Sequence, residues 1–311
     1  MRVSSSPGKI PDMKRTCPTI QELLALDAVA RYQSMTEAAG ALCITVSAVS
    51  KQLGGLESFL GIPLLEKRGR NVQLTRDARA YWQRVSGGLR EIETATFELR
   101  AGMSGADRVS GLLTLASVPT FLTKWLIPRL PEFRRLHPGI TLSFGQHMFR
   151  DSALAPGVDA AIRYGAGGWP DLVSEYIGGR EFVPVGAPDV LGGKGADGAT
   201  ALRGHPLLHH EEAPGAWRQW AAHHGAIDLP TLTGPWFTQY SALIQAVTSG
   251  LGVGLVPSLL VREELAQGSL ITLTDMSVVL DQGHYLCFRP ERADSAALAV
   301  FRHWIREQAS R

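Results

Sequence analysis

The segment from Ser34 to Glu57, SMTEAAGALCITVSAVSKQLGGLE, constrains the fold of this chain more than any other. Its apolar residues recur at the spacing of two short helices joined by a tight turn, with Thr36 and Thr45 as the expected N-caps. In the second helix the residues expected to face inward are Val46, Val49, Leu53 and Leu56. Its outer face would carry Ser47, Ser50, Lys51 and Gln52. The pattern is typical of a DNA-reading helix-turn-helix, and a helical hairpin with a solvated face fits it as well.

The residues on either side favour the DNA-binding interpretation. A helix is expected from Thr19, which has the spacing of a capping box with Glu22. The residues from 61 to 75 predict a two-stranded ribbon with a basic tip. The basic residues of this tip are Lys67, Arg68 and Arg70. Such a ribbon beside a polar helix suits phosphate binding, and residues 1–76 hold ten Lys and Arg against six Asp and Glu.

A long helix is expected next, from Arg76 to about Arg100, with Thr75 as its cap. Its apolar residues follow a seven-residue repeat: Ala78, Val85, Ile92 and Leu99, with Tyr81, Leu89 and Ala95 near the complementary positions. An apolar seam of this kind predicts pairing with a second helix and therefore a dimer. Gly87 and Gly88 weaken the helix, by about 1 kcal/mol each relative to alanine.

Beyond a small, polar hinge around residues 101–110, strands and helices alternate, which predicts α/β units with a mainly parallel sheet. The expected strands are 112–117, 140–144, 159–163, 205–209, 252–256 and 285–288. The expected helices are 121–137, 217–224, 240–249 and 296–308. Two similar halves that cross near 182–186 and again near 286–290 would enclose a cleft for a small ligand.

Polar residues at strand ends and helix starts are the candidates for lining this cleft. They are Ser117, Thr120, Gln146, Arg163, Tyr164, Thr238 and Gln239. Each also has a plainer interpretation, because a hydroxyl caps helices, an arginine pairs with carboxylates and an amide is often exposed. If Arg163 points inward, a carboxylate-bearing effector is favoured, since guanidinium binds carboxylate through two parallel hydrogen bonds.

Other classes of protein receive little support. The histidine-rich segment from His209 to Glu212 lacks a metal-binding spacing and is expected to be an exposed cluster. No nucleophile elbow or phosphate-loop motif is present, so we expect neither an enzyme nor a cofactor nor a metal. Cys17, Cys43 and Cys287 are scattered, which indicates a reducing compartment. With Cys287 alone in the α/β part, in an expected buried strand, a thiol switch is disfavoured.

These features together resemble the LysR-type transcriptional regulators. Residues 19–76 resemble the winged helix-turn-helix of that family, and the order of winged helix, linker helix and α/β region matches it across nearly the whole chain. The motifs LESFLGIPLLEKRGRNVQLT and FLTKWLIPRLPEFRRLHPGI are most similar to the subgroup of the glycine-cleavage and β-lactamase regulators.

The resemblance implies an α+β winged helix-turn-helix, a linker helix and an α/β effector domain of two subdomains, built like a type II periplasmic binding protein. The implied division is a tail at 1–18, a DNA-binding domain at 19–75, a linker helix at 76–101, a hinge at 102–110 and an effector domain at 111–311. Within the effector domain, subdomain I would hold 111–183 and 288–311, and subdomain II 184–287. The expected DNA-contacting residues are Arg31, Thr36, Thr45, Ser47, Ser50, Lys51, Gln52, Lys67, Arg68 and Arg70.

The sequence also departs from the family. Val46 stands where the family usually has a polar residue, often glutamine, so a base contact is lost or replaced by an apolar contact with a thymine methyl group. Gly54 and Gly55 stand where basic residues or helix formers are common.

We therefore expect a cytoplasmic regulator that binds double-stranded DNA at a pseudo-palindrome as a homodimer or homotetramer, with a small-molecule effector and no membrane partner. The alternative is a ligand sensor, similar to a solute-binding protein, that has lost specific DNA readout. The sequence leaves open the effector, the target genes, activation or repression, and whether Met1 or Met13 is the natural start.

Overall fold

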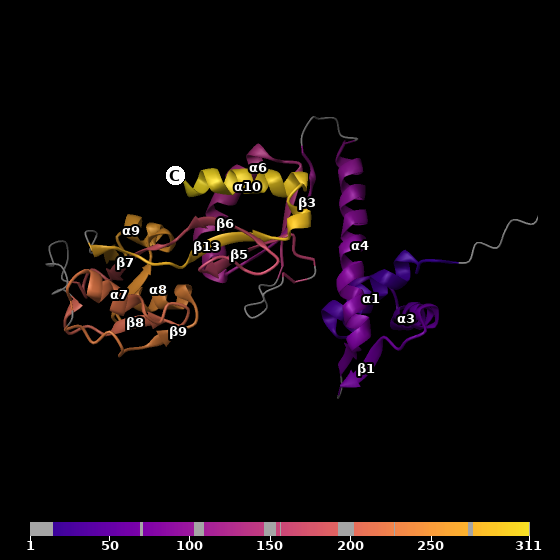
Figure 1. The fold of residues 1–311 in the computed structure, drawn as a ribbon, viewed down its shortest axis with the longest axis horizontal. Coiled ribbons are helices and arrows are strands. Elements are labelled where there is room, and N and C mark those ends of the chain that lie inside the picture. Colours follow the sequence, from indigo (N-terminus) through magenta and orange to yellow (C-terminus); the bar gives the residue numbers. More distant parts are fainter. Residues whose placement is uncertain are drawn as a thin grey trace, which may run out of the picture. The chain divides into compact units, whose positions relative to one another are not determined.

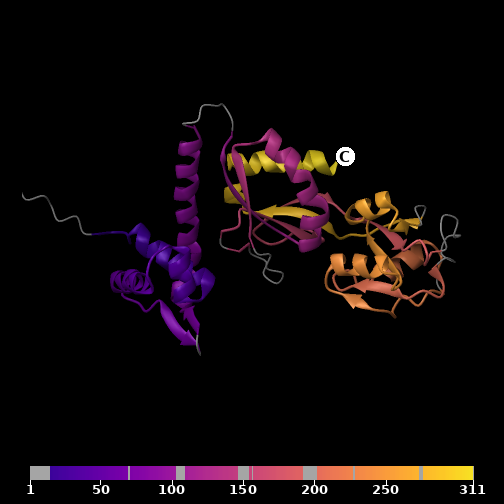
Figure 2. The ribbon, with the colours of Figure 1, turned by 180° about the vertical axis from the view of Figure 1, so that it is seen from behind.

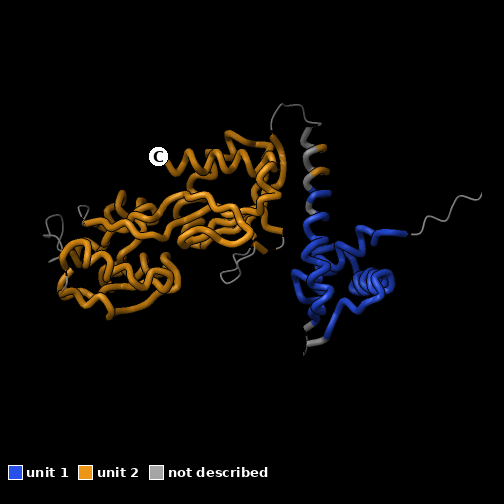
Figure 3. Tube along the Cα trace, in the orientation of Figure 1, with its two compact units in different colours: residues 1–93 blue, residues 94–311 orange. Residues whose placement is uncertain are grey.

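The computed structural model describes residues 15–68, 71–102, 109–145, 154–155, 157–191, 202–226, 228–272 and 276–310. The chain divides into two compact units, residues 1–93 and residues 94–311 (Figure 3). Among the described residues no helix is both long enough and apolar enough to cross a membrane.

The first unit is a three-helix core followed by a hairpin and the long helix (Figure 1). Its elements are α1 (Ile20–Tyr32), α2 (Met35–Ala41), α3 (Val46–Leu60), β1 (Leu65–Arg68), β2 (Asn71–Leu74) and α4 (Arg76–Gly102). The core contains Ala25, Leu26, Val29, Ala38, Val49, Leu53 and Leu56. The three helices and the antiparallel ribbon of β1 and β2 confirm the winged helix-turn-helix pattern expected from the sequence.

Helix capping in this unit follows the sequence with one correction. The capping box of Thr19 and Glu22 is formed, and Thr45 accepts a hydrogen bond from the backbone N–H of Ala48 (3.2 Å). The prediction that Thr36 caps α2 is wrong, because Ser34 accepts from the N–H of Glu37 (3.3 Å) and Thr36 lies exposed in the first turn. An extended serine one residue ahead of Met35 satisfies the free N–H groups earlier than a threonine inside the helix can.

The second correction concerns Val46, which was expected to face the core. It is the first residue of α3 and is 42% exposed, whereas Val49, Leu53 and Leu56 are buried as expected. The reason is geometric. Val49, Leu53 and Leu56 already form the buried face of α3, and Val46 lies at the very start of the helix, next to the N-cap.

The second unit contains two mixed sheets (Figures 1 and 2). The strands of the first, in sheet order, are β4 (Ile140–Phe144), β3 (Gly111–Ser117), β5 (Ala160–Gly165), β13 (Gly283–Phe288) and β6 (Val173–Gly178). The second has β11 (Ile271–Thr272), β7 (Glu181–Gly186), β10 (Val253–Pro257), β8 (Leu207–His210) and β9 (Trp236–Phe237), and β12 (Val278–Val279) also pairs with β7. We call the parts built on these sheets subdomain I and subdomain II.

The expectation of a mainly parallel sheet is wrong in detail. The strands β4, β3 and β5 are parallel to one another, as are β10, β8 and β9. The first strand after each crossing between the subdomains, β7 or β13, pairs antiparallel with its neighbours. A strand that enters a sheet from the neighbouring subdomain has no crossover helix to reverse it, so antiparallel pairing follows.

The chain also crosses between subdomains earlier than 182–186 and 286–290. Because all of β7 pairs in subdomain II and all of β13 in subdomain I, the crossings lie at residues 179–180 and 280–282. The first crossing requires a glycine: Gly179 has φ +88°, and a Cβ there would lie 2.6 Å from Nδ1 of His284.

Helices cover both sheets. Those of the second unit are α5 (Pro119–Phe121), α6 (Leu130–Leu136), α7 (Ala216–His223), α8 (Tyr240–Thr248), α9 (Arg262–Gln267) and α10 (Ala296–Ala309). The helix expected at 121–137 is divided between α5, a π-helical turn (Leu122–Leu126), a 3₁₀ turn (Ile127–Arg129) and α6, because Pro128 and Pro131 interrupt the hydrogen bonding. Helices α6 and α10 lie side by side over subdomain I (Figures 1 and 2), where Phe133 contacts Phe301 and Trp304.

Candidate DNA-reading surface and effector cleft

The outer face of α3 is polar, as the sequence predicted. Ser47, Ser50 and Lys51 are exposed, and Gln52 is half-buried with its amide 3.5 Å from Oε1 of Gln21. Because Ser47 and Lys51 are one turn apart, as are Val46 and Ser50, these four side chains share one continuous face. A helix face of this width fits the major groove, where hydroxyl and ammonium groups can bond base edges.

The hydroxyls at the start of α3 already have partners within the helix. Oγ of Ser47 lies 2.9 Å from Oγ1 of Thr45, the cap of the helix. Ser50 and Lys51 are exposed one turn further on.

The remaining predicted DNA contacts lie on other elements. Arg31 is half exposed near the end of α1, and its Nε lies 2.8 Å from Oδ2 of Asp27, so a phosphate would compete with that carboxylate. Lys67 and Arg68 are at the end of β1, and Arg70 lies outside the described residues.

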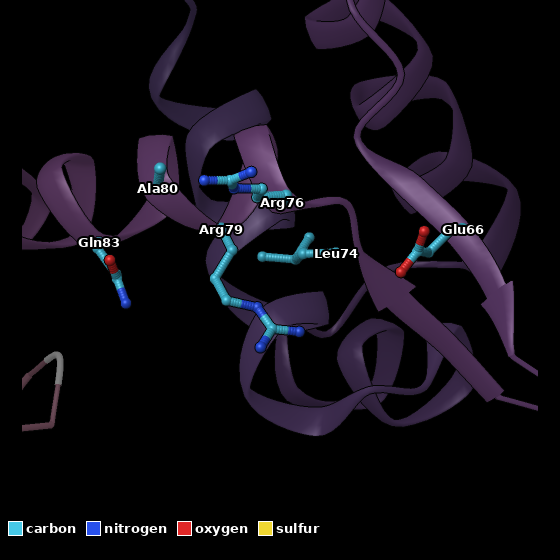
Figure 4. Close-up of a pocket in the computed structure, with 6 residues that line it drawn as sticks. All are labelled: Glu66, Leu74, Arg76, Arg79, Ala80 and Gln83. Carbon is cyan, nitrogen blue, oxygen red and sulfur yellow. The ribbon is translucent and has the colours of Figure 1, made fainter. Parts of the chain in front are cut away.

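A shallow, open pocket of about 310 Å³ lies beside the wing. Its lining residues are Glu66, Leu74, Arg76, Arg79, Ala80 and Gln83 (Figure 4). Arg76 and Arg79 are exposed in the first two turns of α4, next to a ribbon already expected to meet phosphates. Sequence reasoning missed both arginines, although their i, i+3 spacing directly after the wing was visible.

The apolar seam of α4 changes character along the helix. Ala78 is buried in the winged domain core, whereas Ile92 is 51% exposed and Leu99 is 71% exposed. The apolar seam of α4 therefore extends beyond the part of the helix that packs on the winged-domain core.

In the second unit a cavity lies between subdomains I and II. Its lining residues are Val118, Thr120, Phe121, Tyr164, His210, Glu212, Thr238, Gln239, Tyr240, Leu260 and His284. Subdomain I supplies Thr120, Tyr164 and His284, and subdomain II supplies the segment 238–240 at the start of α8. The cavity has a volume of about 20 Å³, which is room for a single water molecule. In this conformation the cleft is closed.

Three buried polar atoms in this lining make no hydrogen bond of normal geometry to another described residue, although the hydroxyls of Tyr164 and Tyr240 lie close enough to perturb each other's pKa. They are Oη of Tyr164, Oη of Tyr240 and Nδ1 of His284. Buried polar groups normally have partners, and leaving one unpaired costs about 1–3 kcal/mol. A cleft that concentrates three of them is suited to a ligand with hydrogen-bonding groups.

The aromatic rings of the cleft pack against one another and are uncharged at neutral pH. The rings of His210 and Tyr240 lie parallel with centroids 3.7 Å apart, and His284 packs on Phe121 (4.6 Å). Burial lowers the pKa of His210 to about 4 and that of His284 to about 3. Burial also raises the pKa of both Tyr164 and Tyr240.

Glu212 is the remaining ionisable group in the lining, and partial burial raises its pKa. None of the described lining residues is a lysine or arginine, so they provide no positive side chain to the cleft. The N-terminus of α8 contributes partial positive charge through its first N–H groups, of which that of Ser241 donates to Oγ1 of Thr120 and none is capped by Gln239.

The structure brings together four of the seven residues expected in the cleft: Thr120, Tyr164, Thr238 and Gln239. Ser117 is not among the residues that line the cavity; its Oγ donates to the carbonyl of Val118 (3.1 Å). Gln146 lies outside the described residues.

Arg163 is not in the lining either. Neighbouring residues of a strand point to opposite faces, so with Tyr164 in the cleft the Arg163 side chain lies on the other face, 5.2 Å from the centre of the Trp169 ring. The inward orientation on which a carboxylate-bearing effector was inferred is therefore contradicted.

Direct bonds between described residues join the subdomains at the cleft. Oγ1 of Thr120 accepts from the backbone N–H of Ser241 (3.0 Å). Lys124 forms an ion pair with Glu264, whose side chain is almost fully buried, and its Nζ also lies 4.0 Å from Oε2 of the exposed Glu263.

In the segment expected to be exposed, His209 and His210 are in fact buried, whereas Glu211 and Glu212 are exposed. His209 stacks on Trp236 and His210 on Tyr240, from opposite faces of β8. Within the described part of the chain no group of three or more His, Cys, Asp or Glu side chains is arranged to hold a metal ion. Cys287 lies in a buried strand, as expected.

Both units match models of known domains. Residues 20–79 match the bacterial regulatory helix-turn-helix protein of the lysR family, and residues 106–310 match the LysR substrate binding domain. The chain belongs to the LysR family of transcriptional regulators. LysR regulators bind DNA through the helix-turn-helix, bind small-molecule effectors through the substrate-binding domain and form oligomers.

Individual relatives agree with this assignment. The glycine cleavage system transcriptional activator of Escherichia coli (strain K12) is 31% identical over 299 residues, which cover 96% of each chain. The regulator TrpI of Pseudomonas aeruginosa is 31% identical and covers 95% of this chain and 99% of that one. Both relatives are named as transcriptional regulators, and neither supports a ligand sensor that has lost DNA readout.

Solved structures of LysR regulators have the same fold. The effector domain of AmpR from Pseudomonas aeruginosa is 30% identical, with a TM-score of 0.57 over 64% of this chain and 95% of that domain. CrgA from Neisseria meningitidis is 25% identical, with a TM-score of 0.53 over 94% of this chain and 99% of that one. The predicted fold class is confirmed.

Sequence reasoning missed several residues that line the cleft of this LysR regulator. Tyr240 follows the predicted Gln239 and begins an expected helix, so the rule of helix starts could have found it. His284 stands just before the expected strand at 285–288, where that rule gives no signal. His210 and Glu212 were visible in the sequence but were assigned to an exposed cluster, because a single strand pattern does not say which face is covered.

Proposed function

We propose that this LysR regulator binds a pseudo-palindromic promoter site as a dimer or tetramer, and that an effector in the cleft between subdomains I and II modulates the binding. The observation that carries the effector half is the cavity with three unpartnered buried polar atoms contributed by both subdomains. We keep residues 19–75 as the DNA-binding domain and 76–101 as the dimerisation helix.

The DNA half of the proposal rests on the surface of the first unit. In each protomer α3 enters the major groove, with Ser47, Ser50 and Lys51 toward base edges, while the wing meets phosphates. Two copies joined through the exposed part of the α4 seam would read two half-sites, so the spacing of the half-sites follows from the dimer.

In this proposal, effector binding shifts the equilibrium between two arrangements of subdomains I and II. A cavity of about 20 Å³ cannot hold a metabolite, so the subdomains must move apart to admit one. A ligand that binds better to one arrangement of the two subdomains than to the other shifts the population toward it. Since the α4 helices join two such domains, this shift would change how the paired winged domains engage their half-sites.

The chemistry of the effector follows from the lining. Two phenol groups, an unpartnered imidazole nitrogen and the start of α8 are positioned to hydrogen-bond a polar ligand, and Phe121 and Leu260 provide apolar contacts. An effector with hydrogen-bonding groups and a compact carbon skeleton fits this lining. We also propose that the ligand is bound and released unchanged, and that the protein acts in the cytoplasm, where its DNA is.

The DNA half is tested with substitutions on α3 and on the wing. Lys51→Ala should change sequence preference, because it alters a group directed at bases. Arg68→Ala should weaken binding to every sequence and reduce the slope of log affinity against log salt concentration by about one unit. Fluorescence anisotropy with specific and random duplexes measures both. A Lys51→Ala variant with unchanged preference would show that α3 is not the reading helix.

The effector half is tested by screening metabolites for those that raise the melting temperature of the full-length protein. At a concentration of 100 times Kd a bound ligand adds about 2.7 kcal/mol of stability. A ligand of this cleft should lose that effect in Thr120→Val and retain it in Ser117→Ala, whose hydroxyl lies outside the lining. Equal stabilisation of the wild type and Thr120→Val would place the effector elsewhere.

A further inference from the structure

The reading face of α3 carries one side chain that hydrogen bonding to bases does not explain. Val46 is the first residue of α3 and is 42% exposed, although the helical spacing had assigned it to the core. It shares the outer face with Ser50, one turn further on. A valine side chain has neither a donor nor an acceptor, so it cannot bond a base edge.

The hydroxyl groups on either side of Val46 already have one partner each in the helix cap. Oγ1 of Thr45 accepts from the N–H of Ala48 at 3.2 Å and lies 2.9 Å from Oγ of Ser47. The start of α3 therefore presents apolar as well as polar surface outward: Val46, and Ile44 in the turn just before it, are each 42% exposed. This end of a recognition helix is the part that contacts base edges.

Only one feature in the major groove matches such a side chain. Apart from the small C5–H of cytosine, the other base-edge groups there are hydrogen-bond donors or acceptors, whereas thymine presents its 5-methyl group. We propose that Val46 is a specificity-determining residue that packs its methyl groups against the 5-methyl of one thymine in each half-site. This inference rests on the proposed function, because Val46 meets bases only if α3 enters the major groove.

The test removes one methyl group at a time from the DNA and from the protein. A half-site is first obtained by selecting random duplexes with the full-length wild-type protein. Each thymine of one half-site is then replaced in turn by deoxyuridine, which lacks the 5-methyl group, and binding is measured by anisotropy. At one thymine we expect the replacement to weaken binding about fourfold, the value for about 0.8 kcal/mol of one buried methyl-sized group.

The same series is repeated with Val46→Ala. This variant should bind the thymine and deoxyuridine duplexes equally well, because the partner of the methyl group is gone. The position is exposed, so the variant should fold normally, and equal affinity for random DNA checks this. Ser58→Ala, at an exposed position near the far end of α3, is the matched control and should keep the fourfold difference.

The outcomes are distinct. A half-site without thymine, a wild type that tolerates deoxyuridine at every position, or a fourfold difference that persists in Val46→Ala would each overturn the inference. Selection that enriches no motif at all would instead contradict the proposed function and remove the basis of the inference with it. Since any effect of deoxyuridine on DNA shape is the same for both proteins, the comparison isolates the contact with Val46.

Discussion

At the scale of single residues, the cleft combines hydroxyl groups that have partners with others that lack them. Oη of Tyr240 is buried near the hydroxyl of Tyr164 and makes no hydrogen bond of normal geometry among the described residues, whereas Oη of Tyr285 accepts from Arg180 (2.6 Å) and donates to the carbonyl of Ala166 (3.2 Å). An unpartnered hydroxyl reduces stability in the unliganded protein and is available to a ligand. The two tyrosines therefore form a natural pair for comparison.

We predict that Tyr240→Phe leaves the unliganded protein as stable as the wild type or more stable by up to about 1 kcal/mol, because it removes a buried unpaired group. Tyr285→Phe should lose about 0.5–1.5 kcal/mol, because it removes hydrogen bonds that are made. Urea denaturation, followed by a spectroscopic signal of the effector domain, measures the free energy of unfolding of both variants. A clear loss of stability in Tyr240→Phe would mean that its hydroxyl has a partner after all.

The buried histidines make stability depend on pH. Burial holds the pKa of His284 at about 3, below its ordinary value of 6.5, so the unfolded chain binds more protons than the folded one between these values. Stability is therefore full above pH 6.5 and falls as the pH drops toward 3. From pH 7 to pH 5 we expect the free energy of unfolding to fall by about 2 kcal/mol on account of His284 alone.

The variant His284→Gln should show a smaller decrease over the same pH range, as measured by urea unfolding at pH 7 and pH 5. His303→Gln, at an exposed position on α10, is the control and should follow the wild type. A His284→Gln variant with the full wild-type decrease would contradict the assignment.

At the scale of elements, α4 serves the winged domain with its first turns and presents an apolar seam with its later ones. Ile92 and Leu99, one heptad apart, are 51% and 71% exposed within this chain. We predict that Leu99→Glu weakens self-association at least tenfold in sedimentation equilibrium, because a buried unpaired charge opposes helix pairing. Glu93→Gln, at an exposed position between the two seam residues, should leave association unchanged. Wild-type association in Leu99→Glu would exclude the seam.

The positions of most helices and strands could be predicted from the sequence, but the directions of some of their side chains could not. The strand at 140–144, the last helix and the wing were predictable, because alternation, helical spacing and caps are local signals. Val46 could not be placed, since a position at the very start of a helix belongs equally to the inward stripe and to the outer face. Arg163 failed for a similar reason: the direction of a strand side chain depends on the register with β13, which no local pattern states.

At the scale of the whole effector domain, the closed cleft is held by bonds between subdomains. Lys124 pairs with Glu264, and Oε2 of Glu264 has no partner among the described residues. We predict that Lys124→Met loosens the closed form by about 1–3 kcal/mol, since it leaves a nearly buried carboxylate unpaired. Amide hydrogen exchange of α9 and of residues 119–126 should become faster.

A double variant separates this effect from simple damage. Adding Glu264→Gln to Lys124→Met removes the unpaired charge and should restore most of the slow exchange. Arg203→Ala breaks an ion pair that is exposed on both sides and should change nothing, because such pairs contribute little. Unchanged exchange in Lys124→Met would show that this ion pair does not hold the cleft closed.

The central claim concerns the molecule as a regulator that reads a specific DNA sequence. The most direct measurement is selection and sequencing of genomic fragments bound by the purified full-length protein at two salt concentrations. We predict enrichment of an inverted repeat, with affinity that falls steeply as salt rises, because bases set the preference and phosphates supply much of the binding. Recovery of fragments without a common motif at both salt concentrations would contradict the account.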